Sequence, residues 1–472
     1  MKNRLLTSIY YNSPEFLQNL GVNLYEFTGT WLNTKSHLYR VLSHQLKISE
    51  KWSKKEFKIY QTKYIKCMIN YAYRNVPFYY RIYKQNNIDI SNINNIDDIK
   101  KLPIINKEQI RDNVEVFSKN KENYVKTHTS GTTGKPLHLR VSKYAYLLQL
   151  AAAYHGRRYP WANYNGGMTA RFVGDAPTMN EKKLYRVSYI TKRLIFPSYF
   201  ISFKTLGKIV NDLKKHKVRY IQAYPSAAYL IAKYLQMKDI SLPMDALFYS
   251  SEPLLDYQRE LIKERFATKV FGFYGQAENA VSAVECEYQT YHLTMLDGYL
   301  EIIDDYGEHA APGEKGFTVV TSFHNHAMPL IRYDLGDYTG LQNEDCSCGR
   351  CIPSLLPVET RIDDFIITPD GRIISPTLLT FPLKKVGGIV ESQYIQKSID
   401  FIELNIVKTD HFGDSEEKIL LSEIKKLLGE DVELKIFYVN RINMTNNYKK
   451  RFVINKMDKD YLEKAFSLVR LE

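Results

Sequence analysis

The feature that most constrains the fold is an alternation of helix and strand patterns between residues 203 and 275. Apolar residues recur at spacings of three and four in the helical segments, and short apolar runs separate these segments. The expected helices cover 203–213, 226–236 and 256–266, and the expected strands cover 219–224, 246–250 and 269–274. This alternation predicts an α/β fold with parallel strands and right-handed crossovers.

A polar cluster follows each of the three expected strands. The clusters are Tyr224-Pro225-Ser226, Ser250-Ser251-Glu252-Pro253 and Tyr274-Gly275-Gln276-Ala277-Glu278. In sheets of parallel strands, ligands bind beyond the carboxyl ends of the strands. Packing alone does not explain three polar clusters at one edge, so we expect a ligand site there.

A loop of small residues, 127–136, predicts a phosphate-binding site. Its central residues are Ser130, Gly131, Thr132, Thr133, Gly134 and Lys135. Backbone N–H groups, hydroxyls and one cation then point at the same place, which suits a phosphate chain. The loop is not a Walker loop, because that pattern needs a glycine at position 130 and a Ser or Thr in place of Pro136. Apolar alternation beyond the loop predicts a strand–loop–strand unit.

The amino-terminal part of the chain is predicted to be helical. The first 50 residues have a mixed helical pattern with breaks at Gly21 and Gly29, and an amphipathic helix is expected over 52–74. Asn106 and Gln109 resemble a capping box that opens a short helix. No chemistry is assigned to this part.

Downstream of the alternating region, one acidic residue suits a nucleotide. Residues 299–322 predict antiparallel strands around the turn 311–314, and Arg332-Tyr333-Asp334-Leu335-Gly336-Asp337 follows an apolar run. The Asp337 carboxylate would suit a pair of ribose hydroxyls, because a carboxylate accepts two hydrogen bonds. The alternative is a surface turn with an ion pair.

Beyond residue 360 the pattern changes to α+β. A hairpin is expected around Asp370-Gly371, and a helix over about 414–428 is expected to begin after Asp414 or Ser415 and to end at Gly429. We therefore predict two domains. The large one, 1–360, holds mixed and parallel sheets flanked by helices, and the small mobile one, 361–472, is α+β.

Cysteine and histidine residues predict a structural zinc site. Cys286 and His292 form one pair of ligands, and Cys346 and Cys348 form another pair far along the chain. Two separated pairs of this kind are how structural zinc sites are built, and three thiolates with one imidazole would close a tetrahedron. Cys351 is spare or replaces one of the four, and the alternative is a set of reduced thiols without metal.

Composition narrows the class of protein. The 472 residues carry a net charge of +13, which is spread along the chain without a basic block. This favours anionic ligands over nucleic acid, which we do not expect as a partner. No signal peptide and no apolar segment of membrane-spanning length is recognised, and the five cysteines are an odd number, so we expect a cytoplasmic protein without a disulfide framework.

Taken in order, these motifs resemble those of the adenylate-forming ligases. The matching segments are Ser130–Pro136 for the phosphate loop, Tyr274–Glu278 for Tyr-Gly-x-x-Glu, Arg332–Asp337 for Arg-Tyr-x-x-Gly-Asp, and Arg361-Ile362-Asp363-Asp364 for the hinge motif. The chain is most similar to the phenylacetate–CoA ligase branch, which includes CapK-like proteins of capsular polysaccharide clusters. Segments 224–226, 250–253 and the Cys/His residues carry that closer similarity.

The resemblance implies ATP-dependent activation of a carboxylic acid as an acyl-adenylate, followed by transfer to CoA or another acceptor, in surface polysaccharide or secondary metabolism. The resemblance also implies roles for single residues. Ser130–Lys135, with Thr133, would bind phosphate, and Asp337, with Arg361 nearby, would contact the ribose. Glu278 would bind Mg²⁺, Lys449 would be catalytic, and adenine would be contacted by Ser251, Glu252, Pro253, Tyr274, Gly275 and Gln276. A homodimer stays open, as does the identity of the acid.

Two departures from the family pattern leave alternatives. Tyr448 stands where a glycine usually precedes the catalytic lysine, so Lys450 and Lys456 are rivals of Lys449. Thr360 stands where a glycine usually precedes the hinge arginine. A catalytically degenerate scaffold of the same fold, in a polysaccharide assembly, is therefore the alternative function.

Overall fold

The structure is a computed structural model of the chain. It describes residues 13–111, 113–119, 123–129, 137–156, 158–174, 184–198, 201, 203–304, 306–358, 365–442 and 452–458. The predicted phosphate loop 130–135, Thr360, the hinge segment with Arg361, and Tyr448, Lys449 and Lys450 lie outside these residues.

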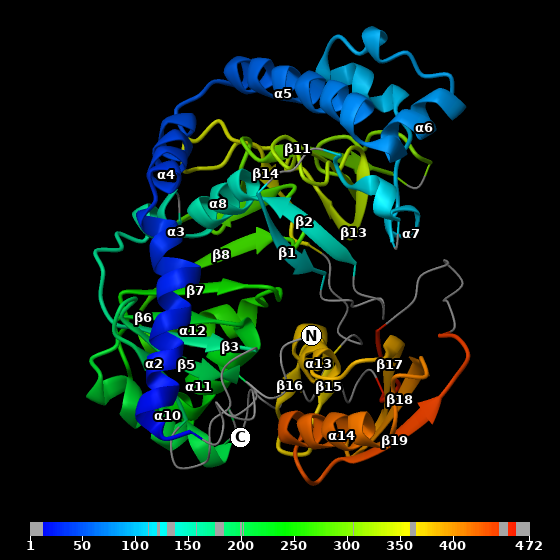
Figure 1. Cartoon of the computed structure of the whole chain (residues 1–472). Coiled ribbons are helices and arrows are strands. Elements are labelled where there is room, and N and C mark those ends of the chain that lie inside the picture. The colour runs from blue at the N-terminus through cyan, green and yellow to red at the C-terminus, as the bar shows by residue number, and fades with distance from the viewer. Residues whose placement is uncertain are drawn as a thin grey trace.

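A nine-stranded mixed sheet forms the centre of the large part of the molecule (Figure 1). In spatial order its strands are β14 (Ser354–Leu355), β10 (Tyr291–Leu293), β9 (Ser282–Glu285), β8 (Lys269–Gly275), β7 (Ala246–Ser250), β6 (Tyr220–Ala223), β3 (Thr169–Val173), β5 (Arg193–Pro197) and β4 (Arg186–Ser188). The five strands from β8 to β5 run parallel, and the remaining pairings are antiparallel.

The predicted alternation of strands and helices is confirmed. The helices are α10 (Phe203–Lys215), α11 (Pro225–Met237) and α12 (Asp256–Phe266). Their apolar faces pack on one face of the sheet, where residues such as Leu206, Ile231 and Ile262 are fully buried. On the other face, α9 (Arg158–Trp161) contributes Tyr159 to a cluster with Phe248 and Phe271. The sheet is therefore covered on both sides, which explains its nearly continuous apolar strands.

A second core lies under α5 (Lys54–Asn75) and α6 (Pro77–Gln85). The α5 helix begins at a capping box between Ser53 and Glu56 and buries Phe57, Ile65 and Met68, as its amphipathic pattern predicts. Further elements here are η2 (Ile90–Asn92), η3 (Ile96–Lys101), α7 (Lys107–Ile110), η4 (Val114–Val116), β11 (Gly298–Ile303), β12 (Lys315–Ser322) and β13 (Tyr333–Gly340). Strands β11 and β12 form the predicted antiparallel pair, and β13, which was not predicted, adds a third antiparallel strand.

The strand–loop–strand unit is also confirmed on either side of the predicted phosphate loop. Strand β1 (Tyr124–His128) pairs antiparallel with β2 (His138–Ser142), and α8 (Lys143–Ala151), η5 (Ala152–Gly156) and α9 follow. Thr129 closes the base of the loop, because its hydroxyl accepts from the Leu137 N–H at 2.9 Å.

The amino-terminal helices run along one side of the molecule (Figure 1). They are α2 (Glu15–Glu26), η1 (Phe27–Trp31), α3 (Leu32–Lys35) and α4 (His37–Ser49). The prediction of a break at Gly21 is wrong, because this residue lies inside α2. Contacts with the edge strand β4, including an Asn23 side-chain hydrogen bond to the Val187 carbonyl at 3.0 Å, accompany the continuous helix.

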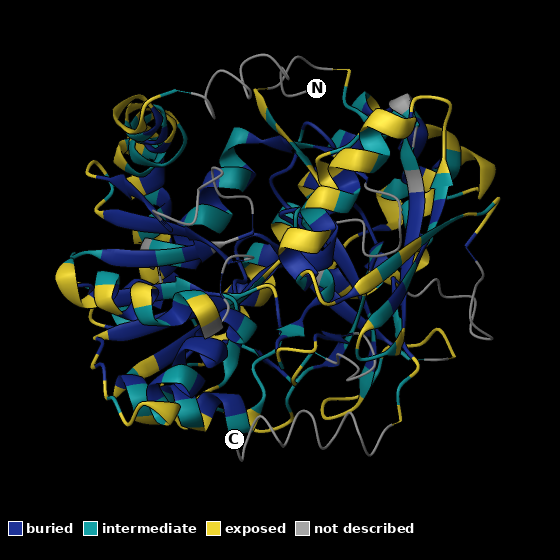
Figure 2. Ribbon diagram, turned by 90° about the horizontal axis from the view of Figure 1, so that it is seen from below, coloured by how far each residue is buried: buried dark blue, intermediate teal, exposed yellow. Residues whose placement is uncertain are grey.

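The described residues beyond 364 form a second unit, which has a two-stranded sheet, a four-stranded sheet and its own core. Its elements are β15 (Ile366–Ile367), β16 (Ile373–Ile374), α13 (Pro376–Lys384), β17 (Ile389–Ser398), β18 (Phe401–Lys408), α14 (Asp414–Leu428), β19 (Glu433–Tyr438) and β20 (Val453–Asn455). The hairpin with its Gly371 turn is confirmed. The predicted helix 414–428 is confirmed as α14 and ends at Gly429, but its N-cap is Gly413 rather than Asp414 or Ser415. Figure 2 shows buried strands under helices with exposed outer faces.

Candidate active site

The three polar clusters meet at one edge of the large sheet, as predicted. Strand β6 pairs in parallel with β7, and β7 pairs in parallel with β8, so their carboxyl ends are neighbours. Ser251 follows β7 with a positive φ of 72°, and Asn279 follows Glu278 with a φ of 51°. Left-handed backbone at non-glycine residues is costly and concentrates at functional sites.

Tyr274 and Asp337 converge from two different sheets. The Tyr274 hydroxyl, at the end of β8, donates to Asp337 Oδ2 on β13 at 2.7 Å. Burial raises the pKa of Asp337, while the Tyr274 hydroxyl and the Lys107 charge oppose that rise. Gly275 follows directly, and a Cβ there would lie 2.6 Å from the Phe273 ring. Gln276 comes next and is half-buried.

Glu278 is a buried carboxylate behind this pair. Its side chain is 3% exposed, and Oε1 accepts from the Tyr333 hydroxyl at 3.3 Å. Burial raises the pKa of Glu278, and Lys107 again opposes the rise. A buried acidic side chain with little compensation suits a cation, because hard divalent cations prefer carboxylate oxygens.

Lys107 is a site residue that the sequence did not reveal. The capping box of Asn106 and Gln109 begins α7, as predicted, and thereby sets Lys107 at the first position of the helix. Its Nζ donates to the Leu335 carbonyl at 2.8 Å, and its charge lowers the pKa values of Glu278 and Asp337. The relevant contacts are more than 170 positions apart in the chain, so no local pattern signals them.

Glu252 joins the sheet edge to the carboxyl-terminal sheet. Its Oε2 accepts from the Ser226 N–H at 3.0 Å, at the beginning of α11, and its Oε1 accepts from the hydroxyl of Ser375, the N-cap of α13. Burial raises the pKa of Glu252, and these hydrogen bonds oppose the rise. The carboxylate is therefore engaged in joining the two parts, with Ser251 and Pro253 on either side.

Arg332 has a structural position. It is 5% exposed, has a φ of 46°, and donates to Glu301 and to the carbonyls of Lys100 and Leu102. These contacts anchor η3 to β11. The alternative of a surface turn is therefore wrong for this end of the motif.

The four predicted zinc ligands lie together. The ligand atoms of Cys286, His292, Cys346 and Cys348 are all within 4.8 Å of one another. Cys286 Sγ and Cys346 Sγ are 3.7 Å apart, close to the edge of about 3.8 Å that Zn–S bonds of about 2.3 Å give in a tetrahedron. His292 Nδ1 donates to the Ile352 carbonyl at 3.0 Å, which directs Nε2 toward Cys348 Sγ at 3.2 Å. Cys351 is exposed and lies outside the cluster.

Lys456, a rival for the catalytic role, follows β20. Its N–H donates to the Gln396 carbonyl at 2.8 Å, and its side chain is exposed.

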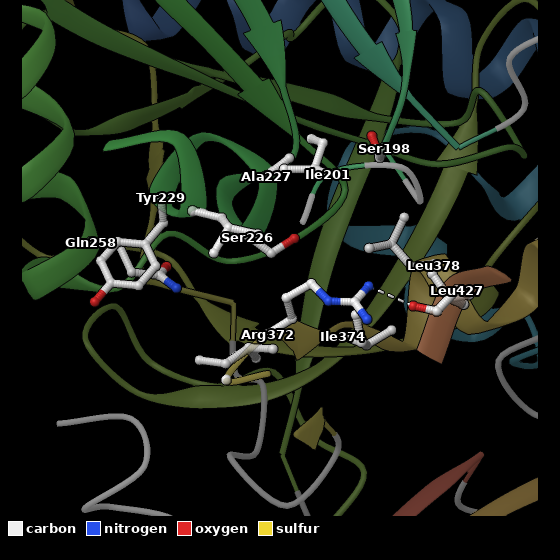
Figure 3. A pocket seen from close by; sticks show the side chains of 13 residues that line it. Ser198, Ile201, Ser226, Ala227, Tyr229, Gln258, Arg372, Ile374, Leu378 and Leu427 are labelled. Carbon is white, nitrogen blue, oxygen red and sulfur yellow. Dashed lines mark hydrogen bonds between the residues drawn. The ribbon is translucent and has the colours of Figure 1, made fainter. Parts of the chain in front are cut away.

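Two cavities adjoin the sheet edge. One, of about 290 Å³, lies at the carboxyl ends of β3, β6, β7 and β8 and is lined by Tyr224, Phe273, Arg158 and Arg171. The sequence analysis did not identify the two arginines. The other is a seam of about 30 Å³ between α11 and the carboxyl-terminal sheet (Figure 3). In the seam, the Arg372 guanidinium donates to the carbonyls of Leu427 and Leu428, the last two residues of α14. This arginine therefore stabilises the carboxyl-terminal end of the helix.

No helix in the described part of the chain is both long and apolar enough to cross a membrane.

Comparisons with known proteins identify relatives. Residues 366–456 match the family model of the CapK C-terminal domain. Protein CapK of Staphylococcus aureus is 26% identical over 470 residues, covering 96% of this chain and all of that protein. A phenylacetate–coenzyme A ligase of Thermus thermophilus is 26% identical over 393 residues, covering 77% and 84%.

A solved structure has the same fold. It is a 2-hydroxyisobutyryl-CoA ligase in complex with 2-HIB-AMP and CoA, with a TM-score of 0.57 and 20% identity over 89% of this chain and 94% of that one. The chain thus has relatives along nearly its whole length. Its α/β fold with a carboxyl-terminal domain is that of adenylate-forming ligases. The chain is a homologue of CapK and of the phenylacetate–coenzyme A ligases.

Proposed function

We propose that this protein is an AMP-forming acid ligase. It activates a carboxylic acid with ATP as an acyl-adenylate and transfers the acyl group to CoA or another acceptor, in surface polysaccharide or secondary metabolism. The observation that carries the proposal is the Tyr274–Asp337 hydrogen bond beside buried Glu278, at the carboxyl edge of the large sheet. Homology to phenylacetate–coenzyme A ligases supports it, and homology to CapK supports the polysaccharide setting.

The first half-reaction joins the acid to AMP. A carboxylate oxygen of the acid attacks the α-phosphorus, the bond to the bridging oxygen of the β-phosphate breaks, and pyrophosphate leaves. In the proposal, Ser130–Lys135 with Thr133 hold the leaving phosphates through backbone N–H groups, and Asp337 accepts from the ribose hydroxyls. Tyr274 orients Asp337 through its hydroxyl and offers its ring to adenine, with Ser251 and Pro253 alongside.

Glu278 is the residue proposed to hold Mg²⁺, since burial raises the pKa of its carboxylate although the Lys107 charge, its own backbone N–H and the Tyr333 hydroxyl oppose that rise. When bound, the ion neutralises charge on the phosphate oxygens. Lys449 is proposed to stabilise the charge that develops between the reacting carboxylate and the α-phosphate.

The second half-reaction needs an acceptor, for which CoA is proposed. The small domain, 361–472, is proposed to turn about the hinge at Arg361 between the two steps, because each step presents a different face of it. The Glu252–Ser375 hydrogen bond would have to break in that movement. A homodimer also stays a prediction.

A structural zinc ion is proposed for the Cys/His cluster. Three thiols and one imidazole match a closed structural site in ligand type and in spacing. Burial raises the pKa of the Cys286 thiol, and the N–H groups of Tyr288 and Cys348, which donate to Cys286 Sγ and Cys346 Sγ, oppose the effect of burial on these two thiols. The ion would join β9 and β10 to the segment after β13.

The alternative of a silent scaffold is not favoured. A scaffold gains nothing from carboxylates such as Glu278 and Asp337, because burial raises their pKa values and disfavours their charged forms. In a ligase, Mg²⁺ would bind Glu278 and the ribose hydroxyls would donate to Asp337, so both carboxylates would have a ligand.

The test is acid-dependent exchange of labelled pyrophosphate into ATP across a panel of carboxylic acids. Lys449→Ala should lower the exchange rate about 100-fold, because it removes a cation from the transition state. Lys418→Ala is the matched control, since its side chain is exposed on α14. If exchange persists in Lys449→Ala but is lost in Lys450→Ala or Lys456→Ala, the catalytic role belongs to Lys450 or Lys456 instead of Lys449. No exchange with any acid, together with no ATP binding in calorimetry, would favour the scaffold.

A further inference from the structure

The cavity beside the proposed nucleotide site is positively charged. Ser251 and Asn279, which belong to the candidate nucleotide site, are among the residues that line it, so we expect an acid in it to have its reacting carboxylate at that end. Its volume of about 290 Å³ is near the lower end of the range of ligand pockets and is enough for a small acid. Among the described residues that line it, none is acidic and two are arginines.

Arg158 is the deeper of the two. Its side chain is 2% exposed, and Nη1 donates to the Tyr249 carbonyl at 3.2 Å. The guanidinium lies 5.0 Å from the centre of the Phe248 ring and 5.4 Å from that of Tyr154. Within the described residues Nε has no hydrogen-bond partner and no carboxylate pairs with the group. A buried, unpaired cation is costly unless a ligand compensates it.

Arg171, on β3, is only weakly compensated. Its Nη1 lies 3.6 Å from Glu26 Oε1, but the same carboxylate is 2.8 Å from Arg193 Nη1. Within the described residues, one carboxylate therefore serves Arg171 and Arg193, while Arg158 has none. The Nε of Arg171 also lacks a hydrogen-bond partner among them.

The neighbouring tyrosine responds to this charge. Burial by itself raises the pKa of Tyr154, yet the charges of Arg171, Arg193 and Arg158 outweigh burial and bring the pKa below its usual value. Two cavity-lining amides have buried atoms without partners among the described residues, Gln149 Nε2 and Gln222 Oε1. The cavity thus offers positive potential and unused polar atoms to whatever occupies it.

Resting on the proposed function, we infer that the acid carries a second anionic group, remote from the carboxylate that reacts, and that Arg158 and Arg171 bind it. A carboxylate, sulfonate or phosphate fits, because guanidinium groups pair with each through two parallel N–H···O hydrogen bonds. An acid with a neutral tail would leave Arg158 buried without a carboxylate partner among the described residues, and Arg171 sharing Glu26 with Arg193. The tail of the substrate is therefore charged, although Phe273 and Leu150 line the same cavity.

The test compares matched acids in the pyrophosphate exchange assay. Phenylacetate is set against 4-carboxyphenylacetate and 4-sulfophenylacetate, and butyrate against glutarate. We expect kcat/KM for the doubly anionic acid to exceed that for its partner about 10-fold or more in the wild type. The preference should fall by a similar factor in Arg171→Gln and in Arg158→Gln, each checked for folding by thermal unfolding.

Arg219→Gln is the matched control. It removes the same charge at the opposite edge of the sheet, just before β6, where Arg219 is half-exposed and pairs with Asp245. Its acid preference should equal that of the wild type. Exchange that is faster with the neutral-tailed acids, or a preference that Arg171→Gln leaves intact, would overturn this inference while the proposed function stands. No exchange with any acid of either class would overturn the proposed function itself.

Discussion

Removal of the proposed zinc ion is expected to lower the stability of the large part of the protein by a calculable amount. The perturbation is Cys348→Ser, which replaces one thiol of the cluster by a hydroxyl of similar shape. Cys286 and Cys346 are 60 residues apart in the chain, so an ion that binds both closes a loop of that length. The loop-closure entropy of such a cross-link gives about 4 kcal/mol.

This free energy converts into a shift in melting temperature. Unfolding entropy is about 2.1 cal/mol/K per residue, so a cooperative unit of about 350 residues should lose about 5 °C in Tm. A strong chelator should produce a similar shift in the wild type. The measurements are zinc content by elemental analysis and Tm by calorimetry, with one ion per chain expected before treatment.

Cys351→Ser is the control, because Cys351 lies on the same loop but is exposed and outside the cluster. It should keep the zinc content and the Tm of the wild type. Protein purified without chelators that holds no stoichiometric zinc would refute the reasoning. So would equal loss of metal in Cys351→Ser and Cys348→Ser.

Three further predictions concern the nucleotide site. Tyr274→Phe keeps the ring but removes the hydrogen bond to Asp337, so KM for ATP in the exchange assay should rise about 10-fold. Tyr338→Phe is the control and should leave KM unchanged, because the Tyr338 hydroxyl makes a weak 3.4 Å contact with the Lys315 carbonyl. Burial puts the pKa of Glu278 in the folded state above its value in the unfolded state, so its stabilising contribution is present at acid pH and is lost as pH rises through the folded pKa. Glu278→Gln should therefore raise Tm more at about pH 8 than at about pH 5, and it should abolish exchange. An equal change in Tm at both pH values would contradict this. Lys107→Met removes the cation that opposes the rise in the pKa values of Glu278 and Asp337 caused by burial, so calorimetry should show weaker ATP binding. Unchanged affinity for ATP would mean that Lys107 is not part of the site.

Most of the fold was readable because it depends on short-range patterns. The alternation over 203–275 predicted α10, α11 and α12 and the parallel strands between them, since periodicity reports which face of an element is buried. Local capping rules predicted α7 and the Gly371 turn for the same reason. The wrong break at Gly21 has the opposite origin, because glycine weakens a helix locally but contacts with β4 along α2 act over a long range.

The candidate site divides in the same way. Sequence motifs predicted Tyr274, Glu278 and Asp337 as candidate site residues, because a few residue types at fixed spacing are typical of nucleotide-binding sites. They did not identify Lys107, Arg158 or Arg171, which stand in no motif. A charged side chain in a sequence has no visible partner, and only the fold shows whether a carboxylate such as Glu26 lies beside it.

By itself, the sequence determined the order of elements, the residue types available at the strand ends and the two separated pairs of candidate metal ligands. The tertiary structure decided which of these meet. It brought β8 to β13, so that Tyr274 bonds to Asp337, and it brought the Cys286 pair to the Cys346 pair. It also decided how deeply each charge is buried, and burial is what sets the pKa of a carboxylate and the need of an arginine for a counter-ion.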